Sequence, residues 1–149
     1  SKQLHLHYVI YRALNLLLSS GESPVNVGQG TELKKKEVWF AALELTTSHQ
    51  LDIDTSFNVL FREGLIIEYK TDAAELEDDK ILPYAMVKPT TFGVLLYCAA
   101  QNRLADWRSF SAEDFGPFNS LQDVTIFASS LQGLLDKAGV KKKAEERNE

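Results

Sequence analysis

Hydrophobic residues recur at helical spacing near the start of the chain. Leu4, Tyr8, Tyr11, Leu14 and Leu18 are three or four positions apart and predict a helix over residues 4–18. A second apolar line runs along the opposite side of the same segment. A helix that is apolar on two sides is either central in its domain or shared with a partner.

Two more helices are expected before the middle of the chain. A short strand over residues 24–27 is expected to lead into a helix over residues 31–46, with Val38, Ala42 and Leu45 on its apolar side. Asp52 or Asp54 is expected to cap the next helix, which ends before Gly64.

The pattern then changes to one that is typical of strands. Residues 65–69 are rich in β-branched and aromatic side chains, and residues 81–87 are expected to return as the second strand of a hairpin. Pro83 indicates an edge position, because proline has no N–H to donate. The polar residues 71–79 between the strands are expected to form a loop.

Two final helices are expected after the hairpin. The first begins at Thr90 or Thr91 and runs to about residue 106, followed by a connector with three phenylalanines. The second runs over residues 120–138, with Ser120 as its cap. Its apolar residues alternate at spacings of three and four: Leu121, Val124, Ala128, Leu131, Leu135 and Ala138.

This regular spacing predicts a dimer interface on the last helix, formed by Leu121, Val124, Ala128, Leu131 and Leu135. We therefore expect a homodimer with twofold symmetry. In the alternative arrangement, the same helix folds back over the connector phenylalanines and closes the core of a monomer.

These elements together predict a mainly α-helical fold with one small β-hairpin. The expected order is helix, strand, helix, helix, strand, strand, followed by C-terminal helices. We expect a domain over residues 1–107, a connector and packing helix over 108–140, and a charged tail over 141–149.

The segment around the hairpin resembles winged helix-turn-helix regulators of the MarR and PadR type. Phe57 to Ile66, which reads FNVLFREGLI, is similar to the end of a recognition helix that enters the first wing strand. Val87 to Gly93, VKPTTFG, is similar to the end of the second wing strand, although Pro89 stands where those families have leucine. The resemblance covers residues 4–101 in order of elements and implies a DNA-binding regulator.

Under that resemblance, the third helix would enter the major groove. The residues expected to reach base edges are Thr55, Ser56, Asn58 and Arg62, and those expected on phosphates are Lys34, Lys35 and Lys36. Residues 71–80 contain five carboxylates and one lysine, however, and carboxylates repel phosphates. The alternative is a protein-interaction module in which the acidic loop, residues 72–79, binds a basic partner and no DNA is bound.

Composition narrows the choice of function further. The 149 residues are 44% hydrophobic and 25% charged, with a net charge of -5, which is typical of a globular domain. The single cysteine, Cys98, excludes an intrachain disulfide and is expected to be buried. No apolar run is long enough to span a membrane, so a cytoplasmic location is expected.

We expect no enzymatic activity, no cofactor and no metal. His5 and His7 are two positions apart on opposite sides of a helix, where they cannot chelate one ion together. The sequence Gly28-Gln29-Gly30 lacks the third glycine and the lysine of a phosphate-binding loop.

Overall fold

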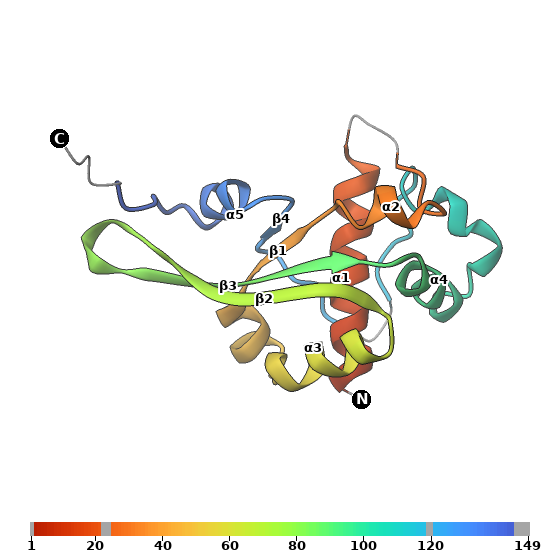
Figure 1. Cartoon of the computed structure of the whole chain (residues 1–149), viewed down its shortest axis with the longest axis horizontal. Helices are drawn as coiled ribbons and strands as arrows, with labels where there is room; N and C mark the ends of the chain where they lie inside the picture. Colours follow the sequence, from red (N-terminus) through yellow and green to blue (C-terminus); the bar gives the residue numbers. More distant parts are fainter. Residues whose placement is uncertain (1, 22–24, 119–120, 145–149) are drawn as a thin grey trace.

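A computed structural model describes residues 2–21, 25–118 and 121–144 (Figure 1). The elements in chain order are α1 (Lys2–Ser19), α2 (Gly30–Leu33), β1 (Val38–Ala41), the π-helical turn η1 (Glu44–Ser48), α3 (Ile53–Arg62), β2 (Ile66–Glu75), the 3-10 turn η2 (Glu77–Asp79), β3 (Ile81–Pro89), α4 (Thr91–Ala100), the 3-10 helix η3 (Leu104–Ser109), β4 (Phe127–Ala128) and α5 (Leu131–Ala138).

The strands form one antiparallel sheet in the order β2-β3-β1-β4. The expectation of a mainly α-helical fold with a small hairpin is therefore wrong, and the protein is a mixed helix-and-sheet fold. The hairpin itself is confirmed, because β2 and β3 pair antiparallel. It is much longer than expected, since β2 continues to Glu75 through residues that were expected to be a loop.

The prediction of a helix over residues 31–46 is wrong. Residues 38–41 are instead the strand β1, which pairs with β3 from Val38–Val87 to Ala41–Tyr84. The run Val-Trp-Phe-Ala satisfies helical spacing and strand alternation equally well over so few residues. Pairing on both sides decides in favour of the strand: Val38 and Phe40 are fully buried, and Trp39 packs on Tyr84 on the other side of the sheet.

Two smaller expectations about strands are also corrected. Pro24 lies outside the described residues, and residues 25–27 are not a strand. The strand β3 is interior rather than at an edge, but β1 pairs with it only between Val87 and Tyr84. Pro83 lies beyond the end of β1, where β3 has β2 as its neighbour, so its missing N–H breaks no pairing with β1.

The prediction of one long helix over residues 120–138 is also wrong. Ser120 lies outside the described residues, and residues 121–126 are irregular. Residues Phe127–Ala128 form β4 against β1. The helix α5 begins only at Leu131, where the side chain of Ser130 accepts a hydrogen bond from the Gly133 N–H and caps the helix.

The first helix is confirmed and is central. Its second apolar side is covered by the chain's own segment after η3, and three polar side chains of α1 hold that segment in place. Asn15 is fully buried; its Nδ2 donates to the carbonyls of Phe110 (2.7 Å) and Glu113 (2.8 Å), and its Oδ1 accepts from the Phe115 N–H (2.9 Å). The other two side chains are those of Arg12 and Tyr8.

Arg12 and Tyr8 tie the same segment to α1 through two carboxylates. Arg12 is 6% exposed and pairs with Asp114 at 2.5 Å and with Asp123 at 3.4 Å. Tyr8 donates to Asp123 at 2.6 Å and accepts from the Phe118 N–H at 2.9 Å. These contacts replace sheet pairing as the means by which the irregular segment satisfies its buried polar groups.

The base of the hairpin is fixed by Tyr11 of α1. Its buried hydroxyl donates to the Leu65 carbonyl and accepts from the Thr90 N–H at 3.1 Å. The helix α4 can approach this hydroxyl because it has glycine at that point. A Cβ at Gly93 would lie 1.9 Å from the Tyr11 oxygen and 2.5 Å from the Leu65 carbonyl oxygen.

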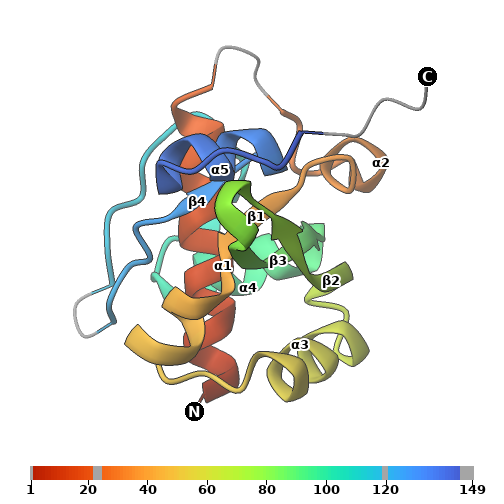
Figure 2. The same ribbon diagram turned by 90° about the vertical axis from the view of Figure 1, so that its left-hand side faces the viewer.

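Two hydrophobic cores result. The larger surrounds α1, and a smaller one lies beneath the far half of the hairpin, where α5 runs beside it (Figures 1 and 2). This smaller core, which we call the distal core, contains Ala74, Leu76, Tyr84, Ala128, Leu134 and Leu135. The hairpin is thus supported along its length and is not a free arm.

We predict that Asn15→Leu lowers the free energy of unfolding by about 3 kcal/mol, because it leaves two buried main-chain groups and one part-buried main-chain group without these partners. Asn58→Leu is the matched control, since it makes the same change at an exposed helical position. Urea unfolding of both variants measures the difference. Equal stability of the two variants would contradict the role given to Asn15.

Candidate functional site

The outer side of α3 is the surface on which DNA contacts were expected. Thr55, Asn58 and Arg62 are exposed there, but Ser56 is 1% exposed and cannot reach a groove. The helix is capped by Asp52, whose side chain accepts from the Thr55 N–H. Three acidic residues of the fully described segment 52–63 are exposed as well, and Arg62 is its one cation; they are Asp52, Asp54 and Glu63.

The lysines expected on phosphates lie elsewhere. Lys34, Lys35 and Lys36 follow α2, and α2 and α3 lie at opposite ends of α1 (Figures 1 and 2). The structure therefore does not bring these lysines together with Thr55, Asn58 and Arg62 on one surface.

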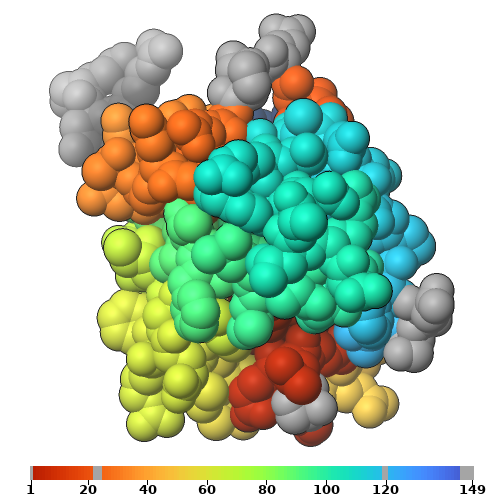
Figure 3. Space-filling model, turned by 90° about the vertical axis from the view of Figure 1, so that its right-hand side faces the viewer, coloured from red at the N-terminus to blue at the C-terminus, as the bar shows by residue number. Residues whose placement is uncertain are grey.

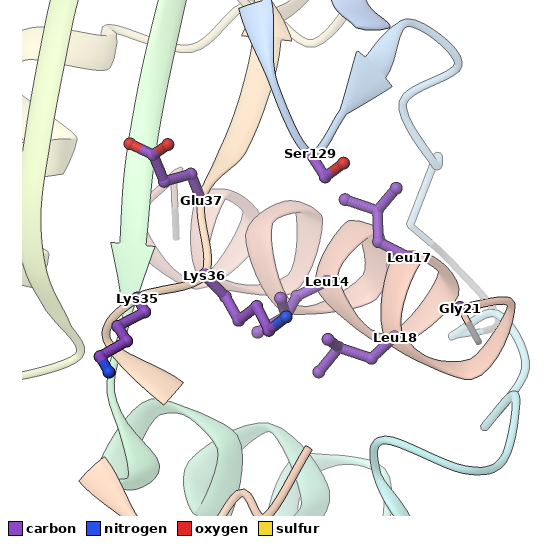
Figure 4. Close-up of a pocket in the computed structure, with 8 residues that line it drawn as sticks. All are labelled: Leu14, Leu17, Leu18, Gly21, Lys35, Lys36, Glu37 and Ser129. Carbon is purple, nitrogen blue, oxygen red and sulfur yellow. The ribbon is translucent and has the colours of Figure 1, made fainter. Parts of the chain in front are cut away.

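Lys35 and Lys36 instead border a cavity of about 500 Å³ at the C-terminal end of α1 (Figure 4). Leu14, Leu17 and Leu18 form its apolar floor, and Ser129 borders it opposite the lysines. The side chain of Lys36 extends along α1 toward Leu14. Its aliphatic stem thus covers part of the apolar floor.

The tip of the hairpin gathers acidic residues from the segment that was expected to be a loop. Leu76 donates to the Lys80 carbonyl at 2.8 Å, which closes a tight turn around η2. Asp78 and Asp79 take positive φ angles of 63° and 57° there. We define the acidic tip as the exposed residues Glu75, Glu77, Asp78 and Asp79.

The C-terminal segment of the chain is paired with the acidic tip. Lys142 forms an antiparallel bridge with Leu76, the Glu77 N–H donates to the Lys141 carbonyl at 3.1 Å, and the Lys143 N–H donates to the Glu75 carbonyl at 2.9 Å. A lysine-rich segment is therefore seated on the outer edge of the hairpin where β2 ends.

Main-chain hydrogen bonds hold this segment. None of the ion pairs found among the described residues joins Lys141, Lys142 or Lys143 to an acidic-tip carboxylate. The four carboxylates therefore remain available to other cations, while the backbone geometry already selects a β-strand.

The open edge of β2 continues beyond the paired residues. This strand is at the end of the sheet, and Thr71 and Ala73 are exposed on the same face as Glu75, with the two-residue period of a strand. The distal core anchors the opposite face through Ala74 and Leu76, both 6% exposed. The edge is thus rigid and accessible, which suits it to strand addition.

The charge of this site is visible in the sequence, but its structure is not. The alternation of Ala74 and Leu76 with Glu75 and Glu77 is the signal of a strand with one buried face. This alternation is short and lies within a polar stretch, so the sequence favoured a loop over a strand. The pairing of Lys141–Lys143 has no signal in the sequence, because that tail is almost entirely charged.

The residues expected at a dimer interface are distributed over an irregular segment, the strand β4 and the helix α5. Val124, Ala128 and Leu135 are buried at 5%, 4% and 1% exposure within the chain's own cores, whereas Leu121 and Leu131 are half-buried. The continuous helical stripe on which the interface was predicted does not form. Homodimer formation itself stays a prediction.

The buried titratable groups belong to the packing around α1. Burial lowers the pKa of His7, whose Nε2 lies 3.1 Å from the Gly93 carbonyl. Burial, followed by the proximity of His49, lowers the pKa of His5, and the two rings are joined at 3.2 Å. Burial also raises the pKa of the Cys98 thiol to about 11, so the expected burial of this cysteine is confirmed.

We predict that stability falls as the pH drops below about 6.5. A lowered histidine pKa means that the unfolded chain binds a proton before the folded one, so the stability present above pH 6.5 is lost on the acid side. His7→Gln keeps a donor for Gly93 but does not titrate. Its unfolding free energy should change less between pH 7.5 and pH 5, as measured by urea unfolding.

The lowered pKa of Asp114, caused first by its hydrogen bond to Arg12, acts in a separate and more acidic range. A pH dependence in His7→Gln as steep as that of the unaltered protein would contradict the prediction.

Metal-ligand groups, membrane-spanning helices and known relatives do not narrow the choice of function. No group of three or more metal-ligating side chains is found in the described part of the chain. Among the same residues, no helix has the length and apolar character to cross a membrane. No protein-family model, curated protein or solved structure matches the chain.

Proposed function

We propose that this chain is a protein-interaction module whose acidic tip binds a lysine-rich, extended segment of a partner protein. The observation that carries the proposal is the seating of the chain's own Lys141–Lys143 on this edge through main-chain hydrogen bonds. That segment has the backbone conformation and the charge that we expect the site to accept from a partner.

The two kinds of contact have different roles in such binding. Main-chain pairing along β2 supplies affinity and sets the register of the added strand. The exposed carboxylates select basic segments and repel acidic ones. The distal core holds the edge in place before binding, which reduces the entropic cost of association.

Duplex DNA binding is a second candidate, supported by one observation. Thr55, Asn58 and Arg62 are exposed together on α3, directly before the hairpin. The resemblance to MarR- and PadR-type regulators belongs to this candidate. Two observations disfavour DNA binding. Acidic residues are exposed on α3, and Lys34–Lys36 lie far from this helix. Binding to mixed-sequence duplexes at low salt, weakened by Arg62→Ala, would favour DNA over a protein partner.

We propose no catalytic role and no cofactor for this module. We also propose a cytoplasmic location, supported by a single, buried cysteine in place of disulfides. Homodimer formation is compatible with it but contributes nothing to the acidic tip.

We predict that a labelled peptide of alternating lysine and valine binds the protein at low salt, and that Glu75→Lys/Glu77→Lys weakens binding about tenfold. Both side chains are exposed and lie on the edge strand or directly after it. Asp54→Lys/Glu63→Lys on α3 makes the same change of charge away from the tip and should bind normally. Fluorescence anisotropy measures all three. No binding by the unaltered protein, or equal loss in both variants, would refute the proposed function.

We also predict that the chain's own tail competes with the peptide. Charge reversal at Lys141, Lys142 and Lys143 to glutamate places like charges beside the acidic tip, and this repulsion should release the tail from its main-chain pairing and raise peptide affinity several-fold. Charge reversal at Lys34, Lys35 and Lys36 is the matched control and should leave the affinity unchanged. Loss of hydrogen-exchange protection at the Glu77 amide should accompany release of the tail. Unchanged protection there would show that the tail had not moved.

A further inference from the structure

A second cavity, of about 320 Å³, lies between the N-terminal half of α1 and α4. Its walls are largely apolar and come from Leu4, Ala100, Phe118 and Leu121 with the rings of Tyr8 and Tyr97. Figure 3 views this side of the molecule, where the green and teal surface that includes α4 lies against the first turns of α1 in red. The cavity shares no residue with α3 or the acidic tip.

The Nδ1 of His7, which lines this cavity, is a hydrogen-bond acceptor without a partner among the described residues. A carbonyl can only accept, so the Nε2 of His7, 3.1 Å from the Gly93 oxygen, carries the ring hydrogen. His7 is 4% exposed, and burial lowers its pKa and keeps the ring neutral. Its Nδ1 therefore retains a lone pair, and no hydrogen bond to this atom is formed within the described part of the chain.

One hydroxyl hydrogen of the same wall is available as a donor. The Nε2 of Gln101 donates one hydrogen to the Gly116 carbonyl (3.3 Å) and the other to the Tyr97 hydroxyl oxygen (3.1 Å). Tyr97 is 1% exposed, and its own hydroxyl hydrogen has no acceptor among the residues that the structure describes. Tyr8 differs, since its hydroxyl both donates to Asp123 and accepts from Phe118.

We propose that this cavity is a binding site for a small, uncharged aromatic alcohol. The apolar walls fit a flat ring, and the ligand's hydroxyl group either donates to His7 Nδ1 or accepts from the Tyr97 hydroxyl. Buried apolar cavities of about 150 Å³ already accept a benzene ring, so the size is sufficient. A carboxylate is disfavoured, because Arg12 is already paired with Asp114 and Asp123, and Asp123 itself is bonded to the wall residue Tyr8.

The test is a titration of the full chain with phenol and with toluene, which has the same ring without the hydroxyl. Two-dimensional NMR should show saturable shifts of amides in α1 and α4, with phenol bound about fivefold more tightly than toluene. Tyr97→Phe should reduce this preference while leaving toluene binding intact. The preference is a ratio within one folded variant, so a change in stability does not imitate it.

Ala100→Phe should fill the cavity and abolish binding of both compounds. Ala99→Phe is the control, because Ala99 is exposed on the same helix and does not line the cavity. Equal binding of phenol and toluene, undiminished binding by a folded Ala100→Phe variant, or no saturable shift up to the solubility of phenol would each overturn the proposal. If Ala100→Phe fails to fold, the effect of Tyr97→Phe on the preference decides alone.

Discussion

The polar side chains of α1 are the constraint on which the rest of the structure depends. A long irregular segment can cover a central helix only when its main-chain groups find partners there, because unpaired buried groups are costly. Asn15 alone supplies three such partnerships, across about a hundred residues of chain. With this face covered, α1 becomes the centre of a single chain and needs no second copy to hide it.

The path of this segment over α1 determines where β4 and α5 lie. Residues 121–128 are led back past α1 by Asp123 and reach β1, where β4 extends the sheet. The helix α5 is thereby placed under the far half of the hairpin, and the distal core forms there. A hairpin supported on one face presents its opposite face and the part of its outer edge before Glu75 to solvent, which is the geometry that an edge-binding partner requires.

Local patterns predicted the parts of the fold that depend on local physics. The first helix, the helix α3 between Asp52 and Gly64, and the antiparallel hairpin all have caps or spacings that specify them unaided. The strands β1 and β4 do not. Val38 and Phe127 fit either type of element, and only the pairing of their strands with distant segments selects one.

The candidate site shows the same contrast between features that local sequence specifies and features that depend on distant contacts. The acidic character of residues 72–79 is visible in the sequence, so a basic partner could be proposed from it. The seating of Lys142 beside Leu76 depends on how α5 directs the chain after Gly139, which has a positive φ of 71°. The three lysines after α2 were expected near α3 on the basis of a family order of elements, and the position of α2 separates them from it.

The pairing of Lys141–Lys143 with β2 also has a consequence for biosynthesis. The hairpin leaves the ribosome well before the segment that covers its acidic end, so the nascent chain carries a bare strand edge during that interval. Unprotected edges are sites of intermolecular aggregation, and clustered like charges are a common safeguard against it. The carboxylates of the acidic tip would keep neighbouring nascent chains apart until the lysines arrive.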